Sequence, residues 1–273
     1  ESKLLNAISD AYELLRAETD DAARKKIYGR IDSLSSAAAK YAVPNEYDKL
    51  STGLGSQGTN AYTSNERTVY ISDIPATELE KWMKIEAERF SELTLRLFHT
   101  ELETVYEEFN RAQDSDYRKS YKAMNEMLYK KHPYGTQTTL GLGDHLKNPS
   151  MVKIHEYFDT YYVPNNVAIC LAGDFDPDEV IALIEENFGG WKRKDVTQPV
   201  HPKEDPITAV QEATVFGPQE EWVQVGYRLD GYNSEDAIML PLLSSVLSNG
   251  TAGIIDLDLI QGQKVLDAYA YGY

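Results

Sequence analysis

Two glutamates in an acidic segment are the side chains of this sequence best suited to hold a metal ion. Glu101 and Glu108 are seven residues apart, in a segment whose pattern predicts a helix from about residue 100 to residue 112. Seven residues rotate a helix by about 700°, which is about 20° short of two turns, so both carboxylates lie on one face. The apolar stripe of the same helix lies about 60–100° to one side of this pair and consists of Phe98, Leu102, Val105 and Phe109. A carboxylate at this border of the buried face can be partly desolvated and aimed at an ion, but the pattern alone favours an ordinary solvated acidic helix.

Other residue patterns exclude several kinds of site. The histidines have no i, i+4 spacing typical of a helical metal pair, and they are His99, His132, His145, His155 and His201. The chain contains neither H-E-x-x-H nor H-x-x-E-H, and it contains no G-x-S-x-G nucleophile elbow. Residues 53–58 match G-x-G-x-x-G, but no strand precedes them and an extended segment follows. A dinucleotide site needs both flanking elements, so it is not indicated.

Composition narrows the class of protein further. The 273 residues include 27 Lys+Arg and 44 Asp+Glu, which gives a formal charge of −17. This charge argues against nucleic acid or an anionic membrane surface as the main partner. The hydrophobic share of 42% is typical of a globular protein. No apolar run approaches the length of a transmembrane helix, so we expect no membrane insertion.

The elements that must position the glutamates read as helices with a few short strands. Apolar residues recur at helical spacing in residues 2–43, which predicts a helical hairpin capped at Asp20 or Asp21 and stopped by Pro44. Further helices are predicted at about 77–90, 117–131, 150–162, 177–188 and 234–248. Strands are predicted at 68–71, 167–172, 212–216 and 222–229. The single cysteine, Cys170, lies inside one of these apolar runs, so we expect it to be buried.

The segment Glu101 to Glu108 resembles the distal metal-ligand helix of the pitrilysin/insulinase family of zinc peptidases. Four further segments resemble the family in the same order, namely 58–64 with 68–70, 132–135, 157–174 and 247–266. The resemblance covers about residues 56–273. It implies an α+β fold with a mixed or antiparallel sheet and helices packed on one face, a pitrilysin-like half followed by the start of a second similar repeat. The implied organisation is a helical hairpin insertion at 1–55, a first peptidase-like domain at 56–196, a linker at 197–211 and the start of a second domain at 212–273.

The resemblance also implies residue roles. Glu108 would be the third protein ligand of a tetrahedral zinc, and Glu101 would orient a ligand histidine. Asn60, Ala61 and Tyr62 would bind an extended peptide substrate by adding it as a strand. The implied activity is that of a zinc-dependent metalloendopeptidase. This interpretation predicts that Glu108 lies beside a cleft near the Asn60 strand and not in bulk solvent.

One departure from the family pattern shapes our expectations. The family places H-x-x-E-H before the Asn-Ala-Tyr-Thr-Ser segment, and residues 1–60 contain no such motif. We therefore interpret the sequence as a piece of a longer protein and expect it, taken alone, to bind no stoichiometric zinc and to cleave no peptide. Its expected partners are a peptide and either the rest of the same polypeptide or a homologous subunit.

Two alternatives remain open at this point. One is a catalytically inactive pitrilysin-like subunit that binds or assembles with an active peptidase. The other is an unrelated α/β binding module in which Glu101 and Glu108 are surface charges. The sequence does not fix the compartment, although an extracytoplasmic or periplasmic location is slightly favoured over the cytoplasm.

Overall fold

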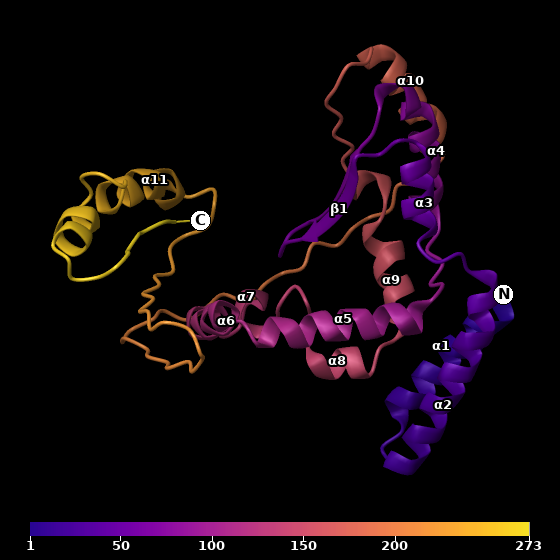
Figure 1. Ribbon diagram of the computed structural model, residues 1–273, viewed down its shortest axis with the longest axis horizontal. Coiled ribbons are helices and arrows are strands. Elements are labelled where there is room, and N and C mark those ends of the chain that lie inside the picture. Colours follow the sequence, from indigo (N-terminus) through magenta and orange to yellow (C-terminus); the bar gives the residue numbers. More distant parts are fainter. Residues whose placement is uncertain (273) are drawn as a thin grey trace. The chain divides into compact units, whose positions relative to one another are not determined.

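A computed structural model describes residues 1–272 of the chain and divides it into two compact units, Glu1–Pro218 and a second that begins at Gln219 (Figure 1). The α-helices of the first unit are α1 (Ser2–Ala17), α2 (Asp21–Ala38), α3 (Glu46–Gly53), α4 (Leu79–Ser91), α5 (Phe98–Gln113), α6 (Asp116–Leu128), α7 (Pro133–Thr136), α8 (Gly143–Lys147), α9 (Met151–Tyr161) and α10 (Pro177–Phe188). Its strands are β1 (Gly58–Thr63) and β2 (Thr68–Asp73), and its 3-10 turns are η1 (Ala39–Tyr41), η2 (Ala76–Glu78) and η3 (Pro164–Asn166). The second unit contains α11 (Glu235–Leu247) and the π-helical turn η4 (Asp256–Gln261).

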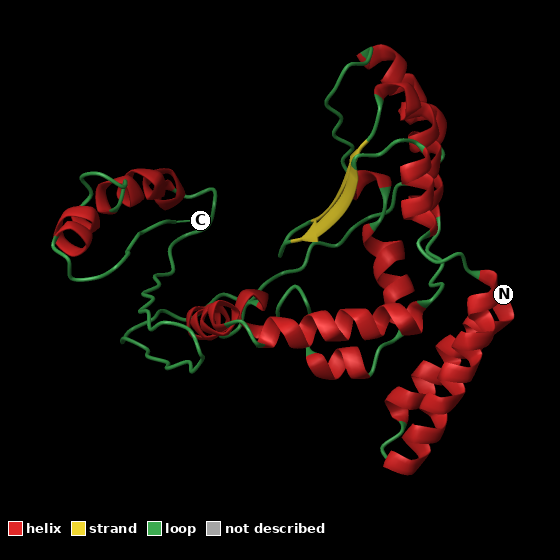
Figure 2. Ribbon diagram, in the orientation of Figure 1, coloured by secondary structure: helices red, strands yellow, loops and turns green. Residues whose placement is uncertain are grey.

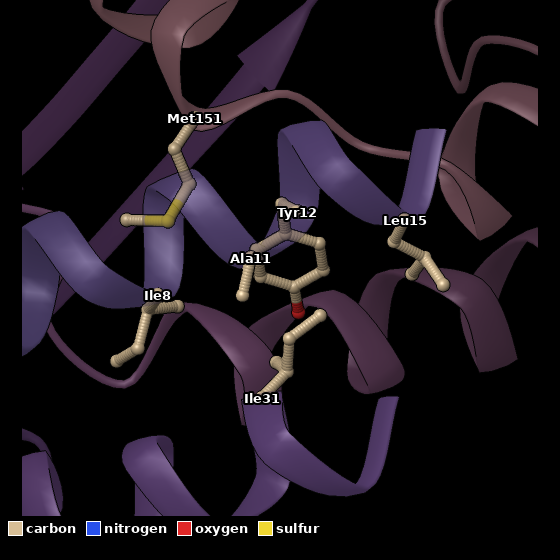
Figure 3. Close-up of a cluster of buried hydrophobic side chains, with 6 residues drawn as sticks. All are labelled: Ile8, Ala11, Tyr12, Leu15, Ile31 and Met151. Atoms are coloured by element: carbon tan, nitrogen blue, oxygen red, sulfur yellow. The ribbon is translucent and has the colours of Figure 1, made fainter. Parts of the chain in front are cut away.

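The predicted helical hairpin is present as α1 and α2 and carries the main core. Asp20 caps α2 by accepting a hydrogen bond from the Ala23 amide at 2.8 Å, as its position in the sequence predicts. Arg24 of α2 donates to the carbonyl oxygens of Leu15 and Glu18, two acceptors that the end of α1 leaves without helical partners. The buried cluster joins both helices to the start of α9 (Figure 3) and consists of Ile8, Ala11, Tyr12, Leu15, Ile31 and Met151.

The sheet is a single antiparallel hairpin, which Figure 2 shows as the yellow ribbon. Strand β1 pairs with β2 in the register Gly58↔Asp73 to Thr63↔Thr68. The Ser64 amide donates to the Arg67 carbonyl oxygen at 2.8 Å across the turn. Since hydrogen-bonded pairs alternate along an antiparallel ladder, the backbone groups of Thr59, Ala61 and Thr63 point away from β2. The hairpin therefore confirms the predicted α+β class and leaves one edge of β1 unpaired among the described residues.

Most of the other helices pack on one another. Helix α4 packs on α10, while α5 packs on α2, α6 and α8. Local signals predict several of these helices well. Asp176 caps α10, with Pro177 at its first position, and Ser150 caps α9. The helix predicted at about 100–112 extends from Phe98 to Gln113.

Three predicted strands are absent from the part of the chain that the structure describes. Residues 167–172, 212–216 and 222–229 form no ladder and are drawn as loops in Figure 2. The prediction of a buried Cys170 is also wrong, because this thiol is exposed. The physical reason is that β-branched composition favours a pleated surface but supplies no hydrogen-bonding partner for it. The predicted segments 1–55, 56–196, 197–211 and 212–273 stay a prediction.

The second unit is organised around a buried carboxylate. Asp256 is 4% exposed, and its Oδ2 accepts hydrogen bonds from the amides of Asn249, Thr251 and Gly253 at 2.9–3.2 Å. The amide of Asn249, and then that of Gly253, hold the pKa of Asp256 below its usual value, because they stabilise the charged form. Helix α11 carries large exposed apolar side chains, including Ile238, Met239, Leu242, Leu243 and Val246.

Candidate functional site

The two predicted metal-site glutamates lie on α5 and are both exposed. Helix α5 begins after Leu97, whose left-handed conformation (φ 55°) turns the chain into the helix. Neither Glu101 nor Glu108 lines the cavity beside the Asn60 strand or the cavity next to it. The structure therefore does not meet the prediction that Glu108 lies beside a cleft near this strand, and the two carboxylates are solvated instead of partly desolvated. The physical reason is that α5 is covered only on its apolar side, which carries the partly buried Phe98, Leu102 and Phe109. No described element covers the side that carries the two carboxylates.

The predicted peptide-binding residues lie on β1, at the edge that carries no partner strand. Asn60, Ala61 and Tyr62 are all exposed, and the guanidinium carbon of Arg67 lies 5.8 Å from the Tyr62 ring centre. The Oδ1 atom of Asn60 accepts a hydrogen bond from the Ala61 amide at 2.8 Å. Because the Ala61 amide points away from β2, Asn60 satisfies one of the outward donors of this edge with its own side chain. A peptide that pairs here must displace this contact or pair around it.

A cavity of about 160 Å³ adjoins the same strand and brings in residues that the sequence analysis did not select. It is lined by Tyr47, Thr59, Asn60, Ala61, Ile71 and Arg89. Tyr47 donates to Glu86 Oε1 at 2.5 Å, and Arg89 lies 3.3 Å from the second oxygen of that carboxylate. Burial, and then the bond to Glu86, raise the pKa of the Tyr47 hydroxyl. The sequence signal was Glu86 itself, a carboxylate on the apolar face of α4 that requires partners when it is buried.

Arg89 links this cavity to a second, larger one. Its guanidinium carbon lies 4.1 Å from the Tyr47 ring centre and 4.8 Å from that of Tyr70, which places a cation between two aromatic faces. The second cavity, of about 320 Å³, is lined by Tyr70, Arg89, Phe90, Leu93, Ile154, Tyr157, Phe158 and Tyr162. The Tyr70 and Tyr162 hydroxyls meet at 2.7 Å beside it. Strand β2 is therefore tied to α4 by the contact of Arg89 with Tyr70, and to the end of α9 by the contact between the two tyrosine hydroxyls.

The part of the chain that the structure describes contains no complete metal site. A carboxylate such as that of Glu108 fits one position of a tetrahedral zinc. Within residues 1–272 no group of three or more His, Cys, Asp or Glu side chains is arranged to hold a metal ion. The same residues contain no helix both long enough and apolar enough to span a bilayer. The arrangement thus offers a carboxylate pair on one helix and an unpaired strand edge on another element.

Comparison with known families matches the chain in two segments. Residues 33–140 match the family model described as Insulinase (Peptidase family M16). Residues 151–273 match the model described as Peptidase M16 inactive domain. The chain is 27% identical over 242 residues to the zinc protease PqqE of Helicobacter pylori, an alignment that covers 86% of this chain and 54% of the relative. It is 29% identical over 134 residues to the probable zinc protease PqqL of Escherichia coli, which covers 47% of this chain and 14% of the relative.

Solved structures show the same fold. A crystal structure of a protease from Helicobacter pylori superposes with a TM-score of 0.65 at 22% identity, covering 84% of this chain and 57% of that one. The periplasmic protease PqqL from Escherichia coli superposes with a TM-score of 0.52 at 24% identity, covering 59% of this chain and 19% of that one. The chain thus spans little more than half the length of the Helicobacter pylori relative. With two models of one family matching successive parts of the sequence, and with relatives that are named zinc proteases, the chain belongs to the M16 family of peptidases, the pitrilysin/insulinase family.

Proposed function

We propose that this chain is part of a zinc-dependent metalloendopeptidase that hydrolyses peptide bonds in extended peptides. The observation that carries the proposal is the pair Glu101 and Glu108 on one face of α5, in a chain that belongs to a peptidase family whose matched relatives are named zinc proteases. Glu108 supplies a carboxylate ligand. Glu101 lies on the same face of α5, about two turns before Glu108, and orients a histidine ligand that comes from outside the described residues.

The residues of this chain then have separate tasks. The chemistry that a bound zinc supplies is activation of water and polarisation of the scissile carbonyl. Glu108 balances the charge of the ion and fixes the distance of α5 from it. The unpaired edge of β1 binds the peptide backbone, so that only a segment free of its own secondary structure can enter. This requirement explains why extended peptides are the proposed substrate class and folded proteins are not.

The test compares two neighbouring charge-neutralising variants in the full-length protein that contains this chain. Glu108→Gln removes the proposed ligand, whereas Glu107→Gln removes another exposed carboxylate one residue away, on another side of α5. We expect Glu108→Gln to lose stoichiometric zinc and at least about 100-fold in peptidase activity, as expected when a metal ligand is removed. Glu107→Gln should keep both. Zinc is measured by atomic absorption and activity with an internally quenched, unstructured peptide.

Two results would overturn the proposal. Full zinc content and activity in Glu108→Gln would place the ligand elsewhere. If the wild-type protein binds extended peptides but binds no zinc and yields no cleavage product, it is an inactive binding subunit instead. Residues 1–273 taken alone should show no peptidase activity and no stoichiometric zinc, because one carboxylate does not complete a tetrahedral ligand set.

We propose an extracytoplasmic location for the parent protein. The support is the matched Escherichia coli protease PqqL, which is described as periplasmic. Fractionation of cells that express the full-length protein tests this, and recovery in the cytoplasmic fraction alone would contradict it.

A further inference from the structure

The helical hairpin, α1 and α2, packs against the N-terminal turn of α5, the helix that carries Glu101 and Glu108. Tyr12 of α1 is 1% exposed, and its hydroxyl lies 2.7 Å from Nδ1 of His99 on α5, a side chain that is 8% exposed. The Tyr12 ring also meets Phe98 edge-on, with ring centres 5.4 Å apart. Burial raises the pKa of the Tyr12 hydroxyl, so this group stays protonated.

The second helix of the hairpin contacts the same imidazole from another direction. Tyr28 of α2 approaches the His99 ring edge-on at 5.2 Å, and its hydroxyl donates to Glu103 Oε1 at 3.3 Å. Nε2 of His99 lies 3.8 Å from that same carboxylate oxygen. His99 is thus held between a tyrosine of α1 and a tyrosine of α2. A hydrogen bond favours a narrow range of distances and angles, so this contact restricts how far α5 can slide or rotate.

Helix geometry connects this packing to the proposed metal site. Glu108 follows His99 by nine residues, a rotation that leaves the two side chains about 180° apart around the axis of α5. Glu101 follows His99 by two residues, a rotation of about 200°, so it also points to the opposite side. The hairpin therefore holds α5 on the side away from the two carboxylates and leaves that pair open to a ligand.

We propose that the Tyr12–His99 contact is a positioning element that fixes the rotation and register of α5 and so orients Glu101 and Glu108 toward zinc. The proposal rests on the proposed function and assigns a role to the hairpin, which carries none of the proposed ligands. Neither Tyr12 nor His99 is a ligand or a catalytic group in this scheme. Their effect on the metal is transmitted through the backbone of α5.

The experiment uses the full-length protein and four variants. Tyr12→Phe removes the hydroxyl and keeps the ring, and His99→Leu removes the ring nitrogen that this hydroxyl contacts. His99→Asn keeps an acceptor atom near the place of Nδ1, and Tyr41→Phe removes a hydroxyl from a tyrosine that is 59% exposed. Zinc affinity is measured by competition with a chelator. Backbone hydrogen exchange is followed in residues 98–113, with the rest of the chain as the internal reference.

The expected result is a pattern and not a general loss. Tyr12→Phe and His99→Leu should weaken zinc binding by about tenfold, in the range seen when a group that orients a metal ligand is removed. Exchange should rise in α5 and not in α10. His99→Asn should remain within about twofold of the wild type, because its amide can donate or accept a hydrogen bond, and Tyr41→Phe should not differ from the wild type.

Three outcomes decide against the proposal. Unchanged zinc affinity in both disrupting variants excludes positioning. Faster exchange throughout the chain, with no rescue by His99→Asn, assigns the contact to general stability. If the wild type binds no zinc, the proposed function fails, and the exchange data alone then decide whether the contact holds α5: unchanged protection in α5 overturns that as well.

Discussion

At the scale of single residues, His132 is a pH-sensitive group because residues distant in sequence surround it. The ring of His132 lies 4.4 Å from that of His201, centre to centre. The amides of Lys131 and His132 both donate to Glu204 Oε1 at 2.6 Å. Burial, and then the neighbouring His201, lower the pKa of His132, while Glu204 and Glu66 act in the opposite direction.

The sign of this shift predicts a loss of stability in acid. A histidine whose pKa is lowered by folding favours the neutral form, so the folded chain loses stability as the pH falls below the unfolded value of about 6.5. We expect His201→Ala to raise the pKa of His132, because it removes both the like charge and part of the burial. NMR titration of the His132 ring measures this directly. The control is His155→Ala, which replaces an exposed histidine and should leave the pKa of His132 unchanged. A lower pKa of His132 in the His201→Ala variant would contradict the proposed effect of His201.

The candidate site itself could be predicted only in part at this scale. The spacing of Glu101 and Glu108 is local information, and α5 does place the two on one face, since a helix has fixed geometry. Their exposure was not predictable from the same stripe, because burial depends on what lies opposite it. Tyr47 was missed because it reaches Glu86 from α3, and no spacing rule connects residues of different elements. Arg89 lies three residues after Glu86 on α4, a spacing that does place the two side chains together.

At the scale of elements, helix ends are the best-predicted features. Asp20, Ser150 and Asp176 each accept a hydrogen bond from an amide of the helix that follows, and each was recognisable within four residues of sequence. The runs at 167–172, 212–216 and 222–229 had strand composition but form no ladder in the described chain. Caps are satisfied within one turn, whereas the partner of a strand can come from any distance along the sequence.

The cap of α2 gives a stability prediction. Asp20→Ala should destabilise the chain by about 1 kcal/mol, because the Ala23 amide loses its acceptor at the start of the helix. Asp32→Ala lies within the same helix, is exposed and removes the same charge. Urea denaturation of both variants, followed by circular dichroism, separates the two effects. Equal midpoints for the two variants would show that the cap contributes nothing beyond charge.

The free edge of β1 gives a binding prediction. Ala61→Pro removes an amide that points away from β2, so the hairpin should keep its register while peptide pairing at this position is lost. Tyr62→Pro removes an amide that faces β2 and should disrupt the hairpin itself. We expect Ala61→Pro in the full-length protein to raise the KM for an extended peptide by roughly tenfold, the loss of about one backbone hydrogen bond. An unchanged KM, with the hairpin intact by NMR, would place the peptide elsewhere.

At the scale of the whole molecule, the division after Pro218 predicts where the chain is cut by a protease. Glu220 and Glu221 are exposed and lie at the start of the second unit, in a stretch without regular structure. Glu204 is held by the amides of Lys131 and His132. A glutamate-specific endoprotease should therefore cleave at Glu220 or Glu221 before Glu204, as read by mass spectrometry of early fragments. Cleavage first at Glu204 would show that the contacts with Lys131 and His132 do not hold in solution.

The contact between Asn60 and Ala61 also bears on how the molecule avoids sticking to itself. Bare strand margins are templates on which identical chains stack into aggregates, and natural proteins blunt them with local devices. Here the Asn60 side chain accepts the hydrogen bond of the outward Ala61 amide, so this amide is not free to pair with a second copy of the chain. A partner anchored at several further points can still dislodge the Asn60 side chain. Asn60, which is proposed to contact the peptide substrate, thereby also reduces unspecific pairing between identical chains.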